Sequence, residues 1–181
     1  MKKFIISIDA GTTSNRSILF NLKGKPIFSS QKEFTQYFPK SGWVEHDPEE
    51  IWKTTLKTLR DVITKAKKNK GKILAIGITN QRETTVLWDK KTGKPVYKAI
   101  VWQDRRQAEY CKKLKKQNKE TIIFNKTGLP IDSYFSGTKI KWILDNVPLA
   151  KKLMNKKQLL FGTIDSFLIW KLTKGKIHAT D

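Results

Sequence analysis

The sequence predicts an α/β domain in which an antiparallel meander of three strands is extended by a parallel strand and flanked by helices. Three observations support this fold class. Short apolar segments separated by turns open the chain, an amphipathic helix follows them, and another apolar segment comes directly after that helix. A helix that connects two strands favours their parallel pairing in one sheet. We therefore expect a mixed sheet with helices packed against it.

The opening meander is predicted at residues 4–8, 17–22 and 27–36. The first two segments are apolar runs that indicate buried strands, and the third alternates between apolar and polar residues. Residues 9–15 and 23–26 are rich in the residue types that form tight turns. Because tight turns join the three strands, we expect neighbouring strands to be antiparallel.

Asp47 marks the start of a long helix. Aspartate is a favoured N-cap residue, Pro48 suits the first helical position, and Glu50 is placed to complete a capping box. Apolar residues follow at helical spacing over 51–66, which predicts a helix with one face packed on the sheet. The apolar run at 72–79 then predicts the parallel strand.

The rest of the chain alternates between short strands and helices. A hairpin is predicted with strands at 84–88 and 96–101 around the turn residues 89–95. Beyond this hairpin we expect helices near 104–118, 120–126, 138–146, 148–155 and 164–172, and a strand at 159–161.

The chain has 181 residues and a formal net charge of +21. Such a charge invites a nucleic-acid interpretation. However, only five of the 37 basic residues are arginine, the usual reader of base edges, and the lysines are spread along the whole chain. A solvated lysine-rich surface with some non-specific attraction to polyanions is therefore favoured over a specific nucleic-acid partner.

Cysteine usage and hydropathy bear on the compartment. Cys111 is the single cysteine, so no intrachain disulfide can form. No apolar run reaches the length of about 18 residues that spans a bilayer. The basic N-terminal residues precede only a short apolar stretch, which fits a first strand better than a signal peptide. We expect a cytoplasmic protein without a membrane span.

The turn after the first strand concentrates groups that suit phosphate and metal. A carboxylate at the end of a buried strand is well placed to hold a hydrated Mg²⁺. Glycine lets a ligand approach the backbone, and hydroxyls beside turn amides suit phosphate oxygens. The candidate residues are Asp9, Gly11, Thr12, Thr13, Ser14 and Arg16. An ordinary hairpin is rich in the same residue types, so these residues alone leave both interpretations open.

Later segments carry residues that suit a small polyol. Arg82 and Glu83 follow a segment that is predicted to be a buried strand, and they can hydrogen-bond neighbouring hydroxyls, one donating and the other accepting. Trp102 at a strand end and Tyr134 in a turn-rich loop can cover the carbon face of a polyol. Taken singly, the charged pair is more typical of a surface ion pair and the aromatics of core packing. Asp104 is predicted to N-cap the next helix.

Together, these segments resemble the glycerol kinases, a branch of the FGGY carbohydrate kinase family within the superfamily of ATPases that includes actin and hexokinase. The segments occur in the order and spacing of that family, and the resemblance covers essentially the whole chain. The matching residues are 9–14, 78–85, 99–106, 134–139 and 162–172. The resemblance implies the ribonuclease-H-like first lobe of an actin-like ATPase fold.

The resemblance also implies a transferase that uses ATP and Mg²⁺ to phosphorylate glycerol to sn-glycerol 3-phosphate in glycerol catabolism. The turn at 9–16 would grip the ATP phosphates, with Mg²⁺ bound at Asp9 through water. The implied glycerol-binding residues are Arg82, Glu83, Trp102 and Tyr134. Full-length members of this family are often homo-oligomers.

Members of the family have two lobes with ATP between them, and 181 residues account for part of the first. We therefore expect residues 1–181 to form an incomplete N-terminal lobe without the second lobe. The family's catalytic-base aspartate would lie beyond Asp181, so the chain alone is expected to be inactive. A separately encoded C-terminal kinase part would then be its partner. The alternatives are a non-enzymatic remnant of a decayed or split kinase gene and, less favoured, a lysine-rich polyanion-binding protein.

Overall fold

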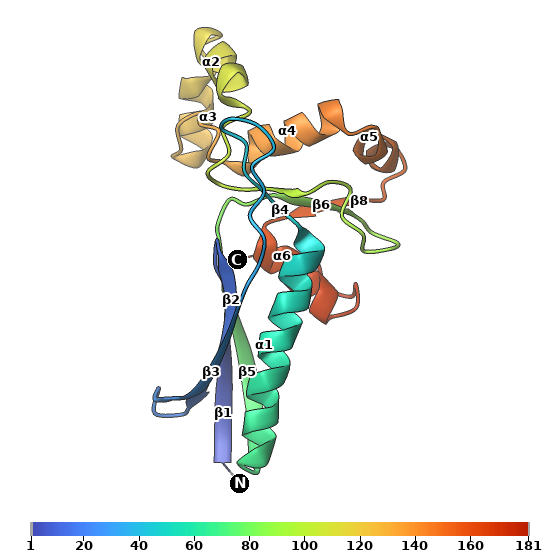
Figure 1. Cartoon of the computed structure of the whole chain (residues 1–181). Helices are drawn as coiled ribbons and strands as arrows, with labels where there is room; N and C mark the ends of the chain where they lie inside the picture. Colours follow the sequence, from blue (N-terminus) through green and yellow to red (C-terminus); the bar gives the residue numbers. More distant parts are fainter. Residues whose placement is uncertain (1, 181) are drawn as a thin grey trace. The chain divides into compact units, whose positions relative to one another are not determined.

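The computed structural model describes residues 2–180, and its backbone divides into two compact units (Figure 1). The first unit comprises Met1–Gln36, Asp47–Gln81 and Ile164–Asp181, and the second comprises Tyr37–His46 and Arg82–Thr163. The chain therefore leaves the first unit twice and returns to it twice.

A four-stranded mixed sheet organises the first unit. Its strands are β1 (Lys2–Ala10), β2 (Ser14–Asn21), β3 (Pro26–Glu33) and β5 (Gly71–Asn80), in the order β3-β2-β1-β5. β2 is antiparallel to both β1 and β3, whereas β5 is parallel to β1. The predicted meander and its parallel extension are confirmed.

Helix α1 (Pro48–Lys68) directly precedes β5 in the chain and runs along the sheet (Figure 1). The predicted N-cap is present, because the Asp47 carboxylate accepts a hydrogen bond from the backbone N–H of Glu49. The Glu50 carboxylate, which was expected to complete a capping box, accepts hydrogen bonds from the backbone N and the hydroxyl of Thr35. Glu50 thus ties the segment after β3 to the first turn of α1.

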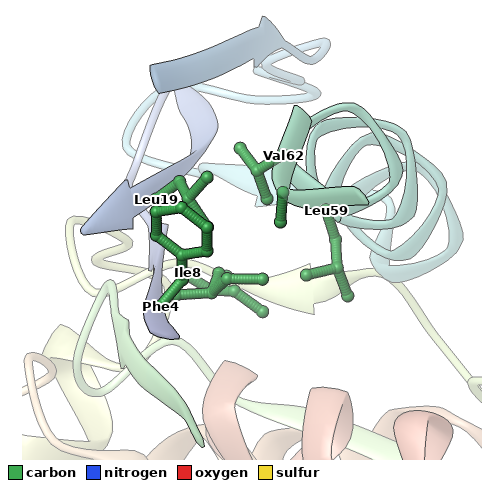
Figure 2. Close-up of a cluster of buried hydrophobic side chains, with 7 residues drawn as sticks. Phe4, Ile8, Leu19, Leu59 and Val62 are labelled. Carbon is green, nitrogen blue, oxygen red and sulfur yellow. The ribbon is translucent and has the colours of Figure 1, made fainter. Parts of the chain in front are cut away.

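The core of the first unit lies between the sheet and α1. Figure 2 shows Phe4, Ile8 and Leu19 from the strands facing Leu59 and Val62 from the helix. Each of these residues is at most 5% exposed, and Leu172 of α6 (Ile164–Leu172) packs against the same cluster. Burial of this apolar stripe is the main force that fixes α1 on the sheet.

The second unit contains shorter elements. Its strands form two pairs: β4 (Glu45–His46) with β7 (Ala99–Ile100), and β6 (Val86–Asp89) with β8 (Leu159–Gly162), both antiparallel. Its helices are α2 (Ala108–Lys116), α3 (Glu120–Thr127), α4 (Ser136–Asn146) and α5 (Pro148–Asn155). Leu87, Ile100, Ile143 and Ala150 form its buried apolar cluster. None of the helices within residues 2–180 combines the length and apolar character needed to cross a membrane.

The predicted hairpin at 84–101 forms only in part. The two segments meet at isolated bridges, Thr85 with Ile100 and Trp88 with Pro95, while the regular partner of β6 is β8. Pro95 has no backbone N–H to donate, so a continuous ladder cannot run through it.

Replacing Gly71 with alanine tests the packing of Phe4 against β5. A Cβ at this position would lie 2.1 Å from Cε2 of the buried Phe4 ring, so the ring or the strand must shift. We expect Gly71→Ala to lower the free energy of unfolding by about 1–3 kcal/mol, the usual cost of overpacking. The control Gly77→Ala, on the same strand with no atom within 4 Å, should cause no such loss. Equal urea midpoints for the two variants would contradict this packing.

Candidate functional site

The turn between β1 and β2 is closed by its own backbone. The Gly11 N–H donates to the Ser14 carbonyl at 3.0 Å. A Cβ on Gly11 would lie only 3.2 Å from that carbonyl oxygen, so glycine allows the chain to turn this tightly. Thr13 is exposed and Thr12 and Ser14 are half-buried, which places three hydroxyl-bearing residues at the surface of the turn.

Side chains from outside the turn fix its backbone. Gln81, directly after β5, donates from Nε2 to the Gly11 carbonyl at 3.1 Å and from its backbone N–H to Ala10 at 2.8 Å. Gln36 Nε2 donates to the Thr12 carbonyl at 3.1 Å. Gln81 lies within the matching segment 78–85, but this role is not visible in the sequence, because only the parallel pairing of β1 and β5 brings Gln81 to the turn.

The buried side chain of Asn15 joins the turn to α1. Its Nδ2 donates to the Ile51 carbonyl at 3.0 Å and to Thr54 Oγ1 at 2.6 Å. The hydroxyl of Ser14 accepts a hydrogen bond from Gln31 Nε2 at 2.8 Å. The turn is therefore anchored on both sides by hydrogen bonds within the chain.

Asp9 and Arg16 lie opposite each other in the β1–β2 register. Directly opposed residues of an antiparallel pair share one face of the sheet. Their neighbours Ile8 and Ala10 are fully buried, whereas Asp9 is half-buried and Arg16 is exposed. Asp9 and Arg16 therefore lie on the face of the sheet away from α1. Within residues 2–180, no group of three acidic, histidine or cysteine side chains could hold a metal ion by itself.

In the second unit, Trp102 and Tyr134 come together although they are far apart in the sequence. Their ring centroids are 5.9 Å apart in an edge-to-face arrangement. Both rings are half-buried and line a cavity of about 370 Å³. The remaining lining residues are Gln103, Asp104, Arg105, Asp132 and Ser133. Aromatic rings beside a few polar groups are a typical lining of small-molecule sites.

Glu83 and Arg82 do not line that cavity. Oε2 of Glu83 accepts hydrogen bonds from the backbone N and the hydroxyl of Ser136, at 3.3 and 3.2 Å. Ser136 begins α4 two residues after Tyr134, so Glu83 is tied to the same loop. Oε1 of Glu83 receives no hydrogen bond from residues 2–180. Arg82 is exposed and forms no ion pair within that range, and its convergence on the aromatic pair stays a prediction.

Asp104 does not cap a helix, contrary to the sequence-based expectation. Helix α2 begins at Ala108, with Gln107 as an N-cap residue that makes no side-chain cap bond. Asp104 instead forms an ion pair with Arg106, whose Nη2 lies 2.8 Å from Oδ2, and accepts from the Val44 backbone N–H at 2.7 Å. The Asp104 carboxylate therefore bonds to the buried Arg106 side chain and to the Val44 backbone, and not to the N-terminus of α2.

The Arg106 side chain is fully buried and connects several loops of the second unit. Its Nη2 also lies 2.8 Å from Glu45 Oε1, which accepts a further bond from the Tyr97 hydroxyl at 2.7 Å. The guanidinium carbon lies 3.8 Å from the Trp43 ring centroid and 4.6 Å from that of Trp142. Burial alone would lower the pKa of Arg106, but the carboxylates raise it overall, so the group stays charged.

These motifs match a known protein family. The model of the N-terminal domain of the FGGY family of carbohydrate kinases matches residues 4–181. The chain is 62% identical over 180 residues to a glycerol kinase of Malacoplasma penetrans, covering 99% of this chain and 36% of that protein. It thus spans about a third of the length of the curated relatives that it matches.

Solved structures agree with this comparison. The Plasmodium falciparum glycerol kinase, solved with ADP, matches with a TM-score of 0.90 and 37% identity over 96% of this chain and 35% of that one. A gluconate kinase from Lactobacillus acidophilus matches with a TM-score of 0.80 and 26% identity, covering 94% and 33% of the two chains. The fold is that of the first lobe of an actin-like kinase, as expected.

Removing the Arg106 guanidinium tests its structural role. Arg106→Met would leave the Asp104 and Glu45 carboxylates buried without a cation, and loss of one partner of such a pair costs about 3–5 kcal/mol. We expect a loss of this size in the free energy of unfolding by urea. Lys112→Met removes the exposed ion pair with Glu109 and should change stability little. If the two variants were equally stable, the buried network would not fix these loops.

Proposed function

The chain belongs to the FGGY family of carbohydrate kinases, and we propose that it carries the glycerol and phosphate sites of an ATP-dependent glycerol kinase. The proposed reaction transfers the γ-phosphoryl group of ATP to a hydroxyl of glycerol and yields sn-glycerol 3-phosphate. The observation that carries the proposal is the juxtaposition of Trp102 and Tyr134 in a polar-lined cavity, with Glu83 bonded to the same loop.

The chemistry of this group suits vicinal hydroxyls. The Glu83 carboxylate is fixed through Oε2, so Oε1 can accept a hydrogen bond from a glycerol hydroxyl. The exposed guanidinium of Arg82 is a donor for a neighbouring hydroxyl. The rings of Trp102 and Tyr134 would cover the carbon chain. Relatives named glycerol kinase are 58–62% identical to the chain, against 26% for the gluconate kinase, which favours glycerol as the substrate.

The β1–β2 turn is the proposed phosphate site. Thr12 and Thr13 present hydroxyls at a backbone turn that is already anchored, which lowers the cost of ordering when phosphate binds. Arg16 would add positive charge near the phosphates. Asp9 fits a magnesium ion that keeps most of its water, because nucleotide-bound Mg²⁺ is commonly held by the phosphates and one or two protein carboxylates. When bound, Mg²⁺ would neutralise part of the phosphate charge.

Catalysis by these residues would consist of positioning. Glu83, Trp102 and Tyr134 would orient one glycerol hydroxyl, and the β1–β2 turn would orient the triphosphate. The chain spans about 36% of the length of its relative from Malacoplasma penetrans. The complete kinase reaction is therefore proposed for the whole protein. The single cysteine, Cys111, leads us to place the reaction in the cytoplasm.

Glycerol binding to the 181-residue chain can be measured directly by isothermal titration calorimetry. Loss of a hydrogen bond to a charged group costs about 1.5–3 kcal/mol, so Glu83→Gln should weaken binding roughly 10- to 100-fold. Glu109→Gln makes the same chemical change at an exposed position and should leave affinity unaltered. Equal affinities for Glu83→Gln and the unsubstituted chain would contradict the proposed polyol site.

Turnover can be tested in a chimera in which this chain replaces the matching segment of the Malacoplasma penetrans glycerol kinase. The unsubstituted chimera should form glycerol 3-phosphate from glycerol and Mg-ATP. The Glu83→Gln chimera should lose about 10- to 100-fold in kcat/KM. A folded chimera that phosphorylates a sugar acid or pentulose in preference to glycerol would refute the substrate assignment.

A further inference from the structure

A buried lysine lies directly behind the proposed polyol site. Lys139, in the first turns of α4, is 0% exposed. Its Nζ donates to the Glu83 carbonyl at 3.0 Å and also to the Tyr134 carbonyl. One ammonium group therefore bonds to the main chain of two of the proposed glycerol-binding residues, which are 51 positions apart in the sequence. Burying a charge is costly, so a lysine at such a place requires compensating contacts.

The backbone that Lys139 contacts needs support. Glu83 has a positive φ of 66°, in the left-handed region that a residue with a side chain adopts at a cost. Its carbonyl accepts from Lys139 Nζ and, at 3.4 Å, from the Ser136 hydroxyl. These bonds favour the left-handed conformation, and that conformation sets the direction in which the Glu83 carboxylate leaves the chain.

The same ammonium also fixes the loop that carries the aromatic ring. Besides the bond to the Tyr134 carbonyl, Nζ lies 5.9 Å from the Tyr134 ring centroid. The Tyr134 N–H donates to Asp132 Oδ1 at 2.8 Å, so both main-chain groups of this residue are engaged. Movement of Lys139 would therefore displace the carboxylate and the aromatic ring together.

We propose that Lys139 is a positioning residue for polyol binding, which holds Glu83 and Tyr134 in the arrangement that receives the substrate. This inference rests on the proposed function of the site. Lys139 is not in contact with the substrate in this account. Its contribution is to make two distant segments of the chain into one rigid binding surface, so that little ordering remains to be done when glycerol binds.

The charge of Lys139 is sensitive to pH in an accessible range. Burial lowers the pKa of Lys139 to about 8, and the carboxylates of Glu83, Asp104 and Asp132 oppose that fall. The thiol of Cys111 is the other titratable neighbour, and burial raises its pKa above the ordinary value. As pH rises through about 8 the ammonium becomes an amine, whose bonds to carbonyl groups are weaker than charge-assisted bonds. Polyol affinity should therefore fall over the same range.

The test compares Lys139→Met with the unsubstituted chain, using glycerol itself as the ligand in calorimetry at about pH 7. We expect Lys139→Met to weaken glycerol binding at least about tenfold while its near-ultraviolet circular dichroism stays native. Lys141→Met, which removes an exposed ion pair from the same helix, is the matched control and should bind normally. Undiminished binding by a folded Lys139→Met variant would overturn the inference.

A pH profile of the unsubstituted chain separates positioning from general stabilisation and also covers the case in which Lys139→Met does not fold. Glycerol affinity should decline between about pH 7 and pH 9 in the unsubstituted chain and in Lys141→Met. A profile that is flat over this range would overturn the inference. Absence of any glycerol binding by the unsubstituted chain would instead refute the proposed function, and with it this inference.

Discussion

The parallel pairing of β1 with β5 is the constraint on which the position of the β1–β2 turn depends. The register sets Ala10 opposite Asn80, so both strands end at one edge of the sheet. Gln81, the next residue, can then donate to the backbone of Ala10 and Gly11 from a position 70 residues away in the sequence. The helix α1 lies between β1 and β5 in the sequence. Its apolar stripe packs on the sheet, and this packing supports the parallel pairing of the two strands. A core of ordinary apolar residues thereby positions a polar turn.

The second unit relies on a different principle. Its strands have two or four residues, and regular ladders can fix little of its backbone. Two buried cations supply the missing order: Arg106 connects Glu45 and Asp104, and Lys139 connects Glu83 and Tyr134. Each cation bonds to groups that the sequence separates widely. In a low-dielectric interior such bonds are strong only when geometry is well matched, so they select one arrangement of the loops.

The fold was largely predictable from sequence, and the supports of the site were not. Apolar periodicity and the Asp47 signature correctly predict α1, and the helix between two apolar runs correctly predicts a parallel strand. Trp102 and Tyr134 were identified as candidates and do come together. Periodicity reports which face is apolar, however, and it carries no information on a buried charge such as Lys139, whose partners are fixed only by tertiary structure. The same limitation explains why Asp104 was mistaken for a helix cap.

We propose that glycerol binds to the residues around Glu83, Trp102 and Tyr134 in the second unit, and that the ATP phosphates bind to the turn at residues 9–16 in the first. Backbone amide chemical shifts of the isotopically labelled chain, titrated with glycerol and separately with Mg-ATP, test this most directly. Glycerol is predicted to move the signals of Glu83, Trp102 and Tyr134, and Mg-ATP those of residues 9–16. Glycerol-induced shifts confined to other parts of the chain, or the same residues responding to both ligands, would contradict the account.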